Sequence, residues 1–532
     1  MIMERFFNTE GPVDSRKQYC LPPLGRIDLS ELVSLIDRER FFILHAPRQT
    51  GKTTCLLALM EHLNREARYR CLYVNFEKAQ SAREDVRAAM HAMLGEIGMR
   101  ARDSLGDPLP LSIVKDSLDK FGAHGALDGL LTTWAQSSSI PIVLLIDEID
   151  ALIGDTLISV LRQLRSGYDK RPAGFPQSIV LCGVRDVKDY RIYSSTEKTQ
   201  ITGGSAFNIK AESLRLGDFI QDEIAALYLQ HTEETGQKFE DDAIELAWNL
   251  TQGQPWLVNA LAYRACFKMK AGRDRSKPIT AAMILEAKEA MIVDRVTHLD
   301  QLAYKLKEPR VQRVIEPMLK CIDLDKPPSE TDTQYVLDLG LIRRGPNGYE
   351  VANPIYREVI PRELTYLAQA NIESRIQPAW YIRADGALDM TKLIGAFQEF
   401  YRENAEVWLE RFAYKEAGPQ LLMQAFLQRI ANGGGYIHRE YGLGRGRTDL
   451  LVIWPHAGGK QKAVIELKLV HKSVARTIAE GLTQTAEYMD RCGVEDDGHL
   501  IIFDRRRGRS WRRKIFRRKA RIKGITIQIW GM

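Results

Sequence analysis

The stretch Phe41-Phe-Ile-Leu-His45, followed by Ala46-Pro-Arg-Gln-Thr-Gly-Lys-Thr-Thr54, decides the fold of the first part of the chain. Its first five residues are a short apolar run typical of a buried strand, and the residues after Thr54, CLLALMEHL, have the apolar spacing of a helix. A loop between a strand and a helix can wrap a phosphate with its backbone N–H groups and with the N-terminus of the helix. This order of elements predicts a phosphate-binding loop rather than a chance occurrence of Gly-Lys-Thr.

The polar residues of this loop have roles that follow from phosphate chemistry. Lys52 is expected to reach the β and γ phosphates of ATP, and the Thr53 hydroxyl is expected to hold Mg²⁺. Ala46 stands where such loops usually begin with glycine, which is a mild change because alanine enters many tight turns. The loop residues expected to bind ATP are Ala46, Pro47, Arg48, Gln49, Thr50, Gly51, Lys52, Thr53 and Thr54.

Two further strands end in polar residues that complete this site. The run IVLLI at 142–146 leads into Asp147 and Glu148, and a carboxylate at the end of a neighbouring parallel strand is where a magnesium ligand must stand. We expect Asp147 to be the Mg²⁺ partner and Glu148 to be the catalytic base that positions water. The strand SIVLCG ends near Arg185, which could sense the γ phosphate or simply form a salt bridge with Asp186.

The pattern of elements changes several times along the chain and predicts an α/β multidomain protein. Apolar strands alternate with helices up to about residue 210, which indicates a parallel sheet covered on both faces. A mostly helical lid, a helix–helix–strand–strand unit of winged-helix type, a helical linker and a second α/β domain follow. The expected domains are 1–210 (P-loop ATPase core), 211–305 (lid), 306–365 (winged helix), 366–404 (linker) and 405–532 (C-terminal domain).

Residues 5–365 resemble the AAA+ and STAND-like P-loop ATPases of bacteria. The resemblance rests on the phrases HAPRQTGKTT, LLIDEIDAL and TQGQPWLVNAL. It implies ATP binding, slow hydrolysis, and a conformational switch or an oligomeric ring. It also implies that Pro255, in Gly253-Gln254-Pro255, lies near the adenine. No arginine finger can be assigned, because each of the candidates is better explained as a surface residue: Arg162, Arg165 and Arg171.

A second group of charged residues lies on two strands near the C-terminus. Asp449 opens the strand LLVIW, and Glu466 and Lys468 follow in the strand AVIELKL. A hairpin would bring Asp449 close to Glu466, and strand alternation puts Glu466 and Lys468 on one face. Two carboxylates so placed can bind Mg²⁺ or Mn²⁺, and the lysine can orient or activate the attacking water. The alternative is a cross-strand salt bridge among the three residues.

This second pattern resembles the core of the PD-(D/E)XK nuclease superfamily, over residues 405–532. Asp449, Glu466 and Lys468 match its acidic and lysine positions, and the preceding Gly444-x-Gly446-Arg-x-Asp phrase matches domains fused to AAA-type ATPases. The resemblance implies a restriction-endonuclease-like α/β fold, and Gln484 fits a glutamine that often accompanies the triad. The chain departs from the superfamily at one position. The superfamily frequently has a glutamate in the helix before these strands, but here Gln420 occupies the best-fitting position and Glu416 lies one turn earlier.

The positive charge of the chain is concentrated at its C-terminus. Residues 505–532 hold 12 Lys or Arg and no acid, whereas the other 504 residues hold 63 basic and 69 acidic side chains. Such a segment neutralises phosphates without reading sequence, and Trp511 or Phe516 could stack on a base. A solvated charge run is the alternative. The residues expected to bind nucleic acid are Gln484, Arg505, Arg506, Arg507, Arg512, Arg513, Arg517 and Arg518.

Composition excludes several classes of protein. The longest apolar run, at 140–146, is too short to span a bilayer, and the charged N-terminus does not fit a signal peptide. The seven cysteines are far apart and contain no CxxC pair, which argues against a zinc site or a disulfide framework. We therefore expect a cytoplasmic protein without a membrane partner.

Together these patterns predict an ATP-binding and ATP-hydrolysing protein that regulates a metal-dependent DNA nuclease. ATP, Mg²⁺ and, at the nuclease site, Mn²⁺ are the expected cofactors, and ATP binding could assemble a homo-oligomer. By family analogy, the pairing of domains fits defence against phage or mobile DNA. Two alternatives remain: a nucleic-acid-binding ATPase with an inactive nuclease fold, and a STAND-type switch that responds to a protein trigger.

Overall fold

A computed structural model of the chain shows two compact units. The first contains residues 1–294 together with 334–342 and 352–354, and the second contains the remainder. The described residues are 4–186, 191–194, 199–202, 207–294, 297–320, 329–345, 348–360, 381–411, 418–431, 436–440, 449–456, 458–470, 473–506, 509–522 and 524–532. None of the helices in these ranges is long and apolar enough to cross a membrane.

The first unit is built on a five-stranded parallel sheet with the order β2-β3-β4-β1-β7. The strands are β1 (Phe41–His45), β2 (Arg70–Asn75), β3 (Ile142–Asp147), β4 (Ser178–Gly183) and β7 (Lys210–Arg215). The last of these corrects the expected domain boundary at residue 210, since β7 pairs with β1 and carries the sheet to Arg215. A short antiparallel pair, β5 (Arg191–Ser194) and β6 (Thr199–Thr202), precedes it.

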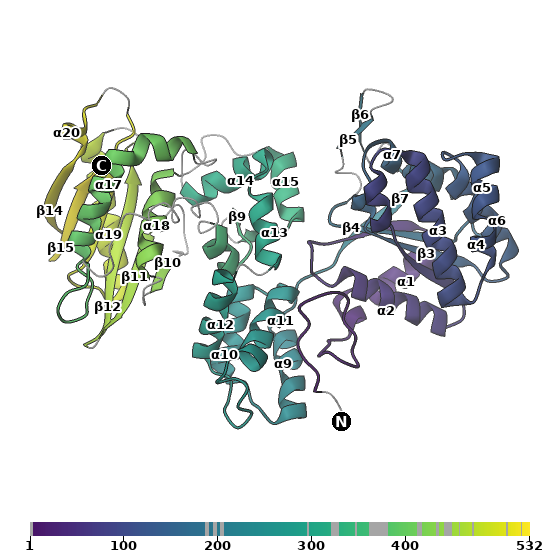
Figure 1. The fold of residues 1–532 in the computed structure, drawn as a ribbon, viewed down its shortest axis with the longest axis horizontal. Helices are drawn as coiled ribbons and strands as arrows, with labels where there is room; N and C mark the ends of the chain where they lie inside the picture. Colours follow the sequence, from purple (N-terminus) through teal and green to yellow (C-terminus); the bar gives the residue numbers. More distant parts are fainter. Residues whose placement is uncertain are drawn as a thin grey trace. The chain divides into compact units, whose positions relative to one another are not determined.

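Helices cover both faces of this sheet, as the continuous apolar strands predict (Figure 1). On one face α1 (Leu29–Asp37) and α2 (Lys52–Arg65) bury Leu32, Leu56 and Leu59 against β1 and β3. The other face is covered by α3 (Val86–Leu105), α4 (Leu109–Ser112), α5 (Val114–Phe121), α6 (Ala126–Ser137) and α7 (Gly154–Ser166). Side chains on both faces of β1, β3 and β4 are therefore buried.

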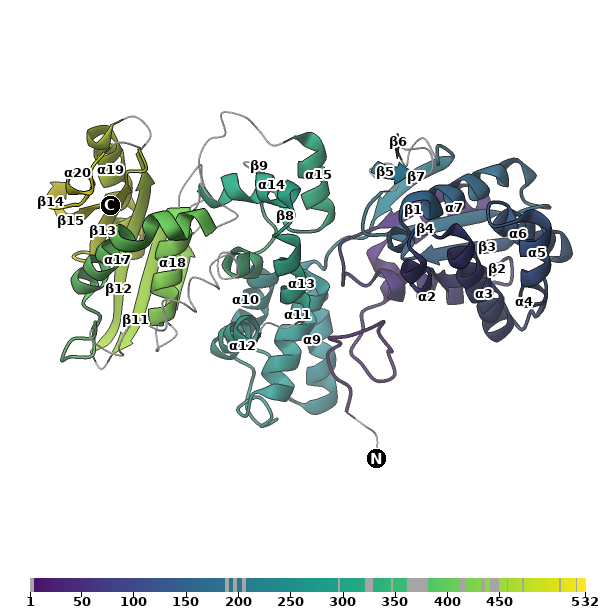
Figure 2. The same cartoon turned by 45° about the horizontal axis from the view of Figure 1, so that its top comes forward.

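The expected lid is helical and forms part of the first unit (Figure 2). Its helices are α9 (Gln221–Thr235), α10 (Asp241–Thr251), α11 (Pro255–Tyr263) and α12 (Ala281–Val293). Proline in the first turn of α11 suits a helix start, because the N–H that proline lacks has no partner there, and the Gln254 side chain caps the Leu257 N–H. The lid thus places the Gly-Gln-Pro element at the N-terminus of a buried helix.

The region expected to form a winged helix contains α14 (Pro309–Lys320), α15 (Glu330–Asp338), β8 (Ile342–Gly345) and β9 (Gly348–Val351), and α13 (Thr297–Lys305) precedes it. The turn residues Pro346 and Asn347 lie outside the described residues. Helix α13, expected in the lid, belongs to the second unit, where His298 Nε2 lies 2.5 Å from Tyr356 Oη. The end of α15 with the following residues, 334–342, instead belongs to the first unit.

The C-terminal domain contains a six-stranded sheet with the order β10-β11-β12-β13-β15-β14. Its strands are β10 (Tyr436–Glu440), β11 (Asp449–His456), β12 (Gly459–Leu469), β13 (Gly498–Phe503), β14 (Phe516–Ile522) and β15 (Ile525–Gly531). β10 to β12 are antiparallel neighbours, β13 and β15 run parallel to β12, and β14 is antiparallel to β15.

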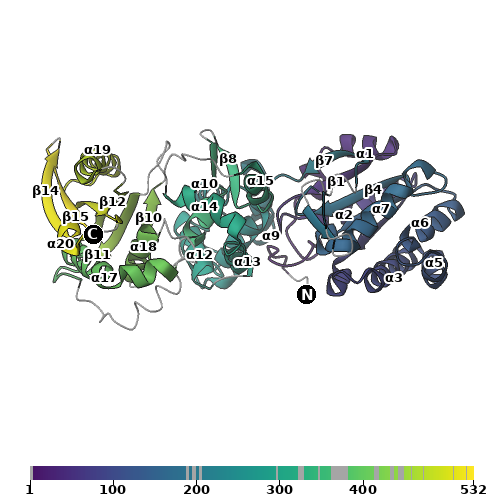
Figure 3. The same ribbon diagram turned by 90° about the horizontal axis from the view of Figure 1, so that it is seen from above.

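Helices lie on both sides of this sheet, with α19 (Val474–Cys492) on one side and α17 (Met390–Arg411) and α18 (Gly418–Ala431) on the other (Figure 3). Helix α17 crosses the expected boundary at residue 404. The Gln398 amide on this helix donates to the carbonyl of Gly531 at 2.6 Å, so α17 is part of the domain rather than a linker. Residues 366–380 of the expected linker lie outside the described residues.

Candidate functional site

The phosphate-binding loop runs from the end of β1 to the first turn of α2. Gly51 immediately before the helix has φ +88°, a left-handed conformation that favours glycine. The Thr50 hydroxyl donates to the Pro47 carbonyl at 2.8 Å, and the Ala46 N–H donates to Gly183 at the end of β4 at 3.2 Å. The loop is therefore tied both to itself and to the neighbouring strand.

The Lys52 side chain lies along this loop and is 6% exposed. Its ammonium donates to the carbonyls of Ala46 and Pro47, both at 3.0 Å. These two carbonyls hold the ammonium at the loop, where a bound phosphate would compete for its protons. Arg48 is exposed, and Gln49 adopts φ 60° before Thr50 and Gly51 complete the turn.

Asp147 ends β3 and is fully buried beside the first turn of α2. Its Oδ2 accepts from the Thr53 hydroxyl at 2.7 Å and from the Tyr73 hydroxyl at 3.1 Å, and its Oδ1 accepts from the Glu148 N–H at 2.9 Å. The sheet order places β3 one strand from β1, across β4. The structure therefore brings the predicted metal partners Thr53 and Asp147 into direct contact.

Glu148 follows in a left-handed backbone conformation with φ 56°. Burial raises the pKa of its carboxyl group, and the nearby charges of Asp150 and Asp147 raise it further, while Lys52 and Arg48 act in the opposite direction. A carboxylate in such surroundings holds a proton more readily than a solvated one. Glu148 thus has the electrostatic environment of a group that can accept a proton from water.

Arg185, the predicted phosphate sensor, has a partner that the sequence does not indicate. Its Nε lies 3.4 Å from Asp338 Oδ2, and its guanidinium lies 4.9 Å from the ring centroid of Tyr335. Both charged side chains are largely buried, and both belong to the first unit. Gly340 lies close to the phosphate-binding loop, because a Cβ there would come within 2.7 Å of Pro47. The 334–342 segment is thus packed against the ATP site.

A pocket beside the loop is lined by residues that sequence reasoning missed. Pro255, predicted near the adenine, contributes to it together with Gln49, Gly51 and Thr54. The other walls come from the N-terminal segment, from the hinge after β7 and from α11: Asn8, Glu10, Gly11, Val13, Tyr19, Cys20, Leu21, Pro23, Arg26, Phe219, Leu227, Trp256 and Asn259. No local motif marks these residues, since they meet only through tertiary contacts.

Arg26 connects the loop with the hinge that leads into the lid. Its guanidinium donates to the Thr50 carbonyl at 2.6 Å and to the Gly217 carbonyl, and it lies 4.8 Å from the ring centroid of Phe219. Burial lowers the pKa of Arg26. The side chain therefore holds the phosphate-binding loop against the residues between β7 and α9.

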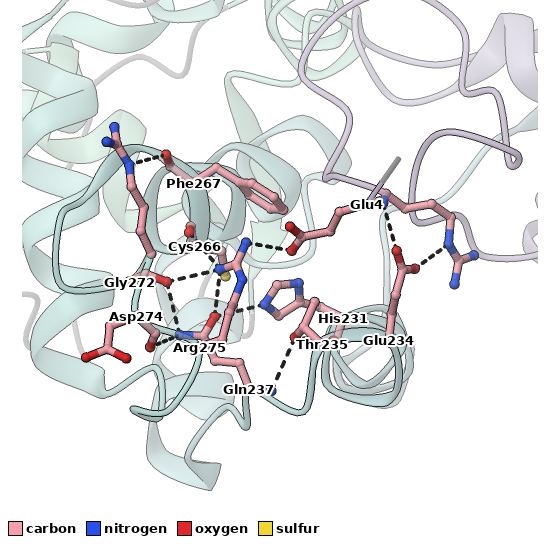
Figure 4. Close-up of polar contacts among 12 residues, drawn as sticks. Glu4, His231, Glu234, Thr235, Gln237, Cys266, Phe267, Gly272, Asp274 and Arg275 are labelled. Atoms are coloured by element: carbon pink, nitrogen blue, oxygen red, sulfur yellow. Dashed lines mark hydrogen bonds and ion pairs between the residues drawn. The ribbon is translucent and has the colours of Figure 1, made fainter. Parts of the chain in front are cut away.

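The N-terminal segment, residues 4–21, is anchored on the lid (Figure 4). Glu4 accepts from Arg275 at 2.6 Å, and the same guanidinium donates to Gln237 at 2.9 Å. Gln237 Oε1 lies 3.0 Å from His231 Nε2, while His231 Nδ1 lies 3.1 Å from the Tyr19 hydroxyl. Burial lowers the pKa of His231, which favours its neutral ring in this network. One wall of the pocket is thus fixed to the lid.

The arginine-finger candidates differ in their surroundings. Arg162 and Arg165 are exposed on α7. Arg171 is not the simple surface residue that we expected, because its guanidinium stacks 3.5 Å from the ring centroid of Tyr168 and 4.9 Å from that of Phe41. These contacts give Arg171 a packing role within its own domain.

The second predicted centre lies on β11 and β12. The antiparallel register pairs Asp449 directly with Glu466. Glu466 is fully buried, and Lys468 Nζ lies 2.6 Å from its Oε1. Gln484 on α19 has a buried Oε1 with no hydrogen-bond donor among the described residues. The Asp449 and Gln420 side chains, and all of Glu416, lie outside the described part.

A buried carboxylate is costly unless a cation or hydrogen bonds compensate it. Lys468 supplies one such cation, and a divalent metal ion would supply a second. Among the described side chains, no cluster of three or more His, Cys, Asp or Glu could hold a metal ion. Of the predicted ligand pair, only Glu466 has a described side chain.

The basic C-terminal segment is folded, which the interpretation as a solvated charge run does not predict. It forms α20 (Trp511–Lys514) and strand β14. Arg506 makes a two-point ion pair with Asp504, with distances of 2.6 and 2.8 Å, whereas Arg505, Arg512, Arg513 and Arg518 are exposed. Arg517 is also exposed, but it donates to Gln528, and Arg507 lies outside the described residues.

One comparison with known protein families matches part of the first unit. Residues 36–190 match the protein family described as an AAA domain. This region is therefore a P-loop ATPase domain of the AAA type, a class that binds and hydrolyses nucleotides and uses Mg²⁺. No curated protein matches the chain.

Solved structures resemble the chain only weakly, both in sequence identity and in TM-score. A Walker-type ATPase of Pyrococcus abyssi has 13% identity and a TM-score of 0.46, covering 66% of this chain and 99% of that one. The RuvB Holliday junction branch migration motor of Thermotoga maritima has 15% identity and a TM-score of 0.32, with coverages of 62% and 91%. Cdc6p from Pyrobaculum aerophilum has 16% identity and a TM-score of 0.36, with coverages of 64% and 93%.

Proposed function

We propose that this protein uses ATP binding and hydrolysis in its first unit to control a metal-dependent DNA nuclease in its second. The observation that carries the nuclease proposal is the pairing of Asp449 with the buried Glu466, whose carboxylate contacts Lys468. The pairing of these two domains also leads us to propose a role in defence against phage or mobile DNA.

In the ATPase domain, Lys52 binds the β and γ phosphates, and the loop from Ala46 to Thr54 encloses them. Thr53 and Asp147 would hold Mg²⁺, because a hydroxyl and a carboxylate 2.7 Å apart offer the hard oxygen ligands that this ion prefers. The ion would neutralise charge on the phosphates. Glu148 orients the attacking water and accepts its proton, and Arg185 and Pro255 contact the γ phosphate and the adenine.

In the nuclease domain, Asp449 and Glu466 would hold Mg²⁺ or Mn²⁺. Such an ion lowers the pKa of bound water and stabilises charge on the phosphodiester. Lys468, whose Nζ lies 2.6 Å from Glu466 Oε1, can place the water for in-line attack, while Gln484 offers its amide to the substrate. Gln420 stands where related nucleases often carry a glutamate, so this site would have one carboxylate fewer. We therefore propose that cleavage is slow or uses a single metal ion.

The topology of the C-terminal sheet supports this proposal. Three antiparallel strands, β10 to β12, are followed by α19 and by β13, which returns parallel to β12. Val464 on β12 and several residues of α19 belong to one apolar cluster. Helix α19, which carries Gln484, therefore covers the face of β12 on which Val464 lies. Glu466 and Lys468 have the same parity in the strand as Val464.

A STAND-type switch is a second candidate, favoured by the packing of 334–342 against Arg185 and Pro47. In this version a protein trigger releases the segment, the chain assembles with ATP, and the C-terminal domain is the effector. If the chain assembles with ATP in the absence of nucleic acid, and a Lys52 variant does not, this result would favour the switch over direct control of cleavage.

The test is cleavage of supercoiled, linear and single-stranded DNA by the full chain with Mg²⁺ or Mn²⁺, with and without ATP. Loss of one charged group that stabilises the reacting centre typically costs about 100- to 1,000-fold. Lys468→Ala should therefore cut at least about 100-fold more slowly, whereas Lys462→Ala, on the same strand but outside the cluster, should cut normally. No cutting by the unaltered protein together with intact ATP hydrolysis would reject the nuclease proposal.

A further inference from the structure

We propose that the outer edge of the C-terminal sheet, formed by α20 and β14, binds the phosphate backbone of a nucleic acid duplex and does not bind unpaired bases. The choice of nucleic acid as ligand rests on the proposed nuclease function. The preference for a duplex rests on how charges and aromatic rings are arranged on this edge.

No carboxylate of the described residues neutralises the charges on this edge. Seven Lys or Arg lie between residues 512 and 521, with no acid among them. None of the seven forms an ion pair with a carboxylate in the described part of the chain: Arg512, Arg513, Lys514, Arg517, Arg518, Lys519 and Arg521. By contrast, Arg506 and Arg509 pair with Asp504 at 2.6 and 3.4 Å. Uncompensated cations at this density attract a polyanion.

The register of the sheet places these cations near the candidate nuclease residues. Phe516, which begins β14, pairs with Gly531, which pairs with Ile502, which pairs with Lys468. Helix α20 immediately precedes Phe516, so it lies at the same end of the sheet as Lys468. Three strand spacings amount to about 14 Å, or about four base-pair steps along a duplex. One short duplex can therefore contact both.

The aromatic residues of the segment are used in packing. The Trp511 ring lies edge-on 6.1 Å from Tyr401, with Lys514 Nζ 5.3 Å from its centroid. Phe516 packs against the apolar cluster beneath α19, and Trp530 is 1% exposed. Proteins that bind single strands without sequence preference stack bases on accessible rings. Trp511 and Phe516 are only partly exposed, whereas Arg512, Arg513, Arg517 and Arg518 are exposed, so this edge offers more cationic surface than ring surface.

The cations on β14 divide between two faces. Arg517 donates to Gln528 Oε1 at 2.8 Å and lies 4.4 Å from the Trp530 centroid, so it supports the fold. Arg518 points to the opposite face by strand alternation. We therefore assign the phosphate contacts nearest the candidate nuclease site to Arg512, Arg513 and Arg518.

Charges on an edge strand can instead serve only to prevent edge-to-edge aggregation. β14 pairs with β15 on one side, and in the strand order it has no neighbour on the other. This explanation predicts that neutral variants aggregate while nucleic acid binding is unchanged. The two roles are therefore separable by experiment.

The experiment measures binding of the full chain to a 5′-labelled duplex and to a single strand of the same length, in EDTA, over a range of salt concentrations. Arg512→Gln/Arg513→Gln should weaken duplex binding and make the log–log salt slope shallower by about 0.9 for each phosphate that is no longer neutralised, about 1.8 in all. The matched control, Lys460→Gln/Lys462→Gln, removes two cations from the other end of β12 and should leave the slope unchanged. Trp511→Phe should not alter single-strand binding.

Several outcomes would overturn the inference. An unchanged salt slope in the α20 variant, or an equal weakening in the control, would show that this edge is not the binding surface. Tighter binding of the single strand, with weaker binding in Trp511→Phe, would establish a stacking platform instead. EDTA prevents metal-dependent cleavage, so binding and cutting are measured separately. Duplex binding in EDTA, with no cutting when Mg²⁺ or Mn²⁺ is added, would reject the nuclease proposal but support the binding surface.

Discussion

Asp147 and Glu148 are adjacent carboxylates with different surroundings, and this difference separates their roles. Asp147 accepts three hydrogen bonds, from Thr53, Tyr73 and the following N–H, which fix both of its carboxylate oxygens. Glu148 is buried beside two other acids, which raise the pKa of its carboxyl group. The two carboxylates are therefore distinguished by the charges and hydrogen-bond donors around them, not by residue type alone.

Replacing Glu148 tests its role as a base. Glu148→Gln should reduce the rate of ATP hydrolysis by at least about 100-fold, because general-base catalysis contributes about 100- to 10,000-fold, while ATP binding is retained. In the unaltered protein, the raised pKa of Glu148 means that hydrolysis should fall with acidification already above pH 4.5, the ordinary pKa of glutamate. Hydrolysis and equilibrium ATP binding measured across pH check both expectations.

The matched control is Asp119→Asn, which removes an exposed carboxylate from α5. It should leave the rate and the pH profile unaltered. A Glu148→Gln variant that hydrolyses ATP at the normal rate would contradict the assignment of the base.

At the scale of elements, short segments far apart in the sequence complete the ATP site. The N-terminal segment forms one wall of the pocket and is fixed to the lid through Glu4 and Arg275. The end of α15 packs against Arg185 and Pro47. Both contacts connect the nucleotide site with elements outside the parallel sheet, so a change at the phosphates can reach them.

The ion pair between Arg185 and Asp338 should stabilise the docking of 334–342. Asp338→Asn leaves Arg185 largely buried without its carboxylate, and breaking such a pair costs about 3 to 5 kcal/mol. Hydrogen exchange of amides in 334–342 should then accelerate by about 100-fold or more, since about 1.4 kcal/mol corresponds to a factor of ten.

Asp332→Asn on the same helix is the control, because its pair with Arg313 is more exposed. Exposed pairs contribute at most about 1 kcal/mol, so exchange should change little. Equal effects of the two substitutions would show that the Arg185 contact does not hold this segment.

At the scale of the whole molecule, the two proposed chemistries lie in different compact units. Lys52, Asp147 and Glu148 are in the first unit, and Glu466 and Lys468 are in the second. Residues of the winged-helix region are shared between the units, with 334–342 in the first and α14 in the second. The proposed control of cleavage by ATP therefore requires the two units to be coupled.

The effect of ATP on cleavage tests this coupling. Lys52→Ala should lose the change in cutting rate that ATP causes in the unaltered protein, because the ammonium that binds the phosphates is gone. Cleavage assays with and without ATP measure this difference. Lys120→Ala, on the exposed face of α5, should keep the full ATP response. A Lys52→Ala protein that still responds to ATP would show that the nucleotide acts elsewhere.

Much of the fold could be predicted from local pattern. The strands β1, β3 and β4 coincide to within a residue with the apolar runs that predict them, and the lid is helical as expected, because continuous apolar runs and helical spacing are local signals. β10 and β14 were missed. β14 is almost entirely charged on its exposed positions, so only its pairing with β15 makes it a strand.

The site was predicted only in part, because local patterns do not show which distant residues meet. The contact between Thr53 and Asp147 was expected because the carboxyl ends of parallel strands meet at one edge of the sheet, although β4 lies between β1 and β3. The pairing of Asp449 with Glu466 follows from a hairpin register. The walls that the N-terminal segment gives to the pocket beside the loop, the contact of Arg26 with Gly217 and the partner of Arg185 were not predicted. Each depends on residues more than 100 positions apart.

The sequence by itself determined which chemical groups are present and which local elements carry them: a phosphate-binding loop, two acidic strand ends and a basic C-terminal segment. Only the tertiary structure decided which of these groups have charged partners within the fold, as Arg185 has Asp338 and Arg506 has Asp504, and which remain exposed, as on α20. The physical reason is that hydrogen bonds and ion pairs depend on distance in space, whereas strand and helix periodicity depends on distance along the chain.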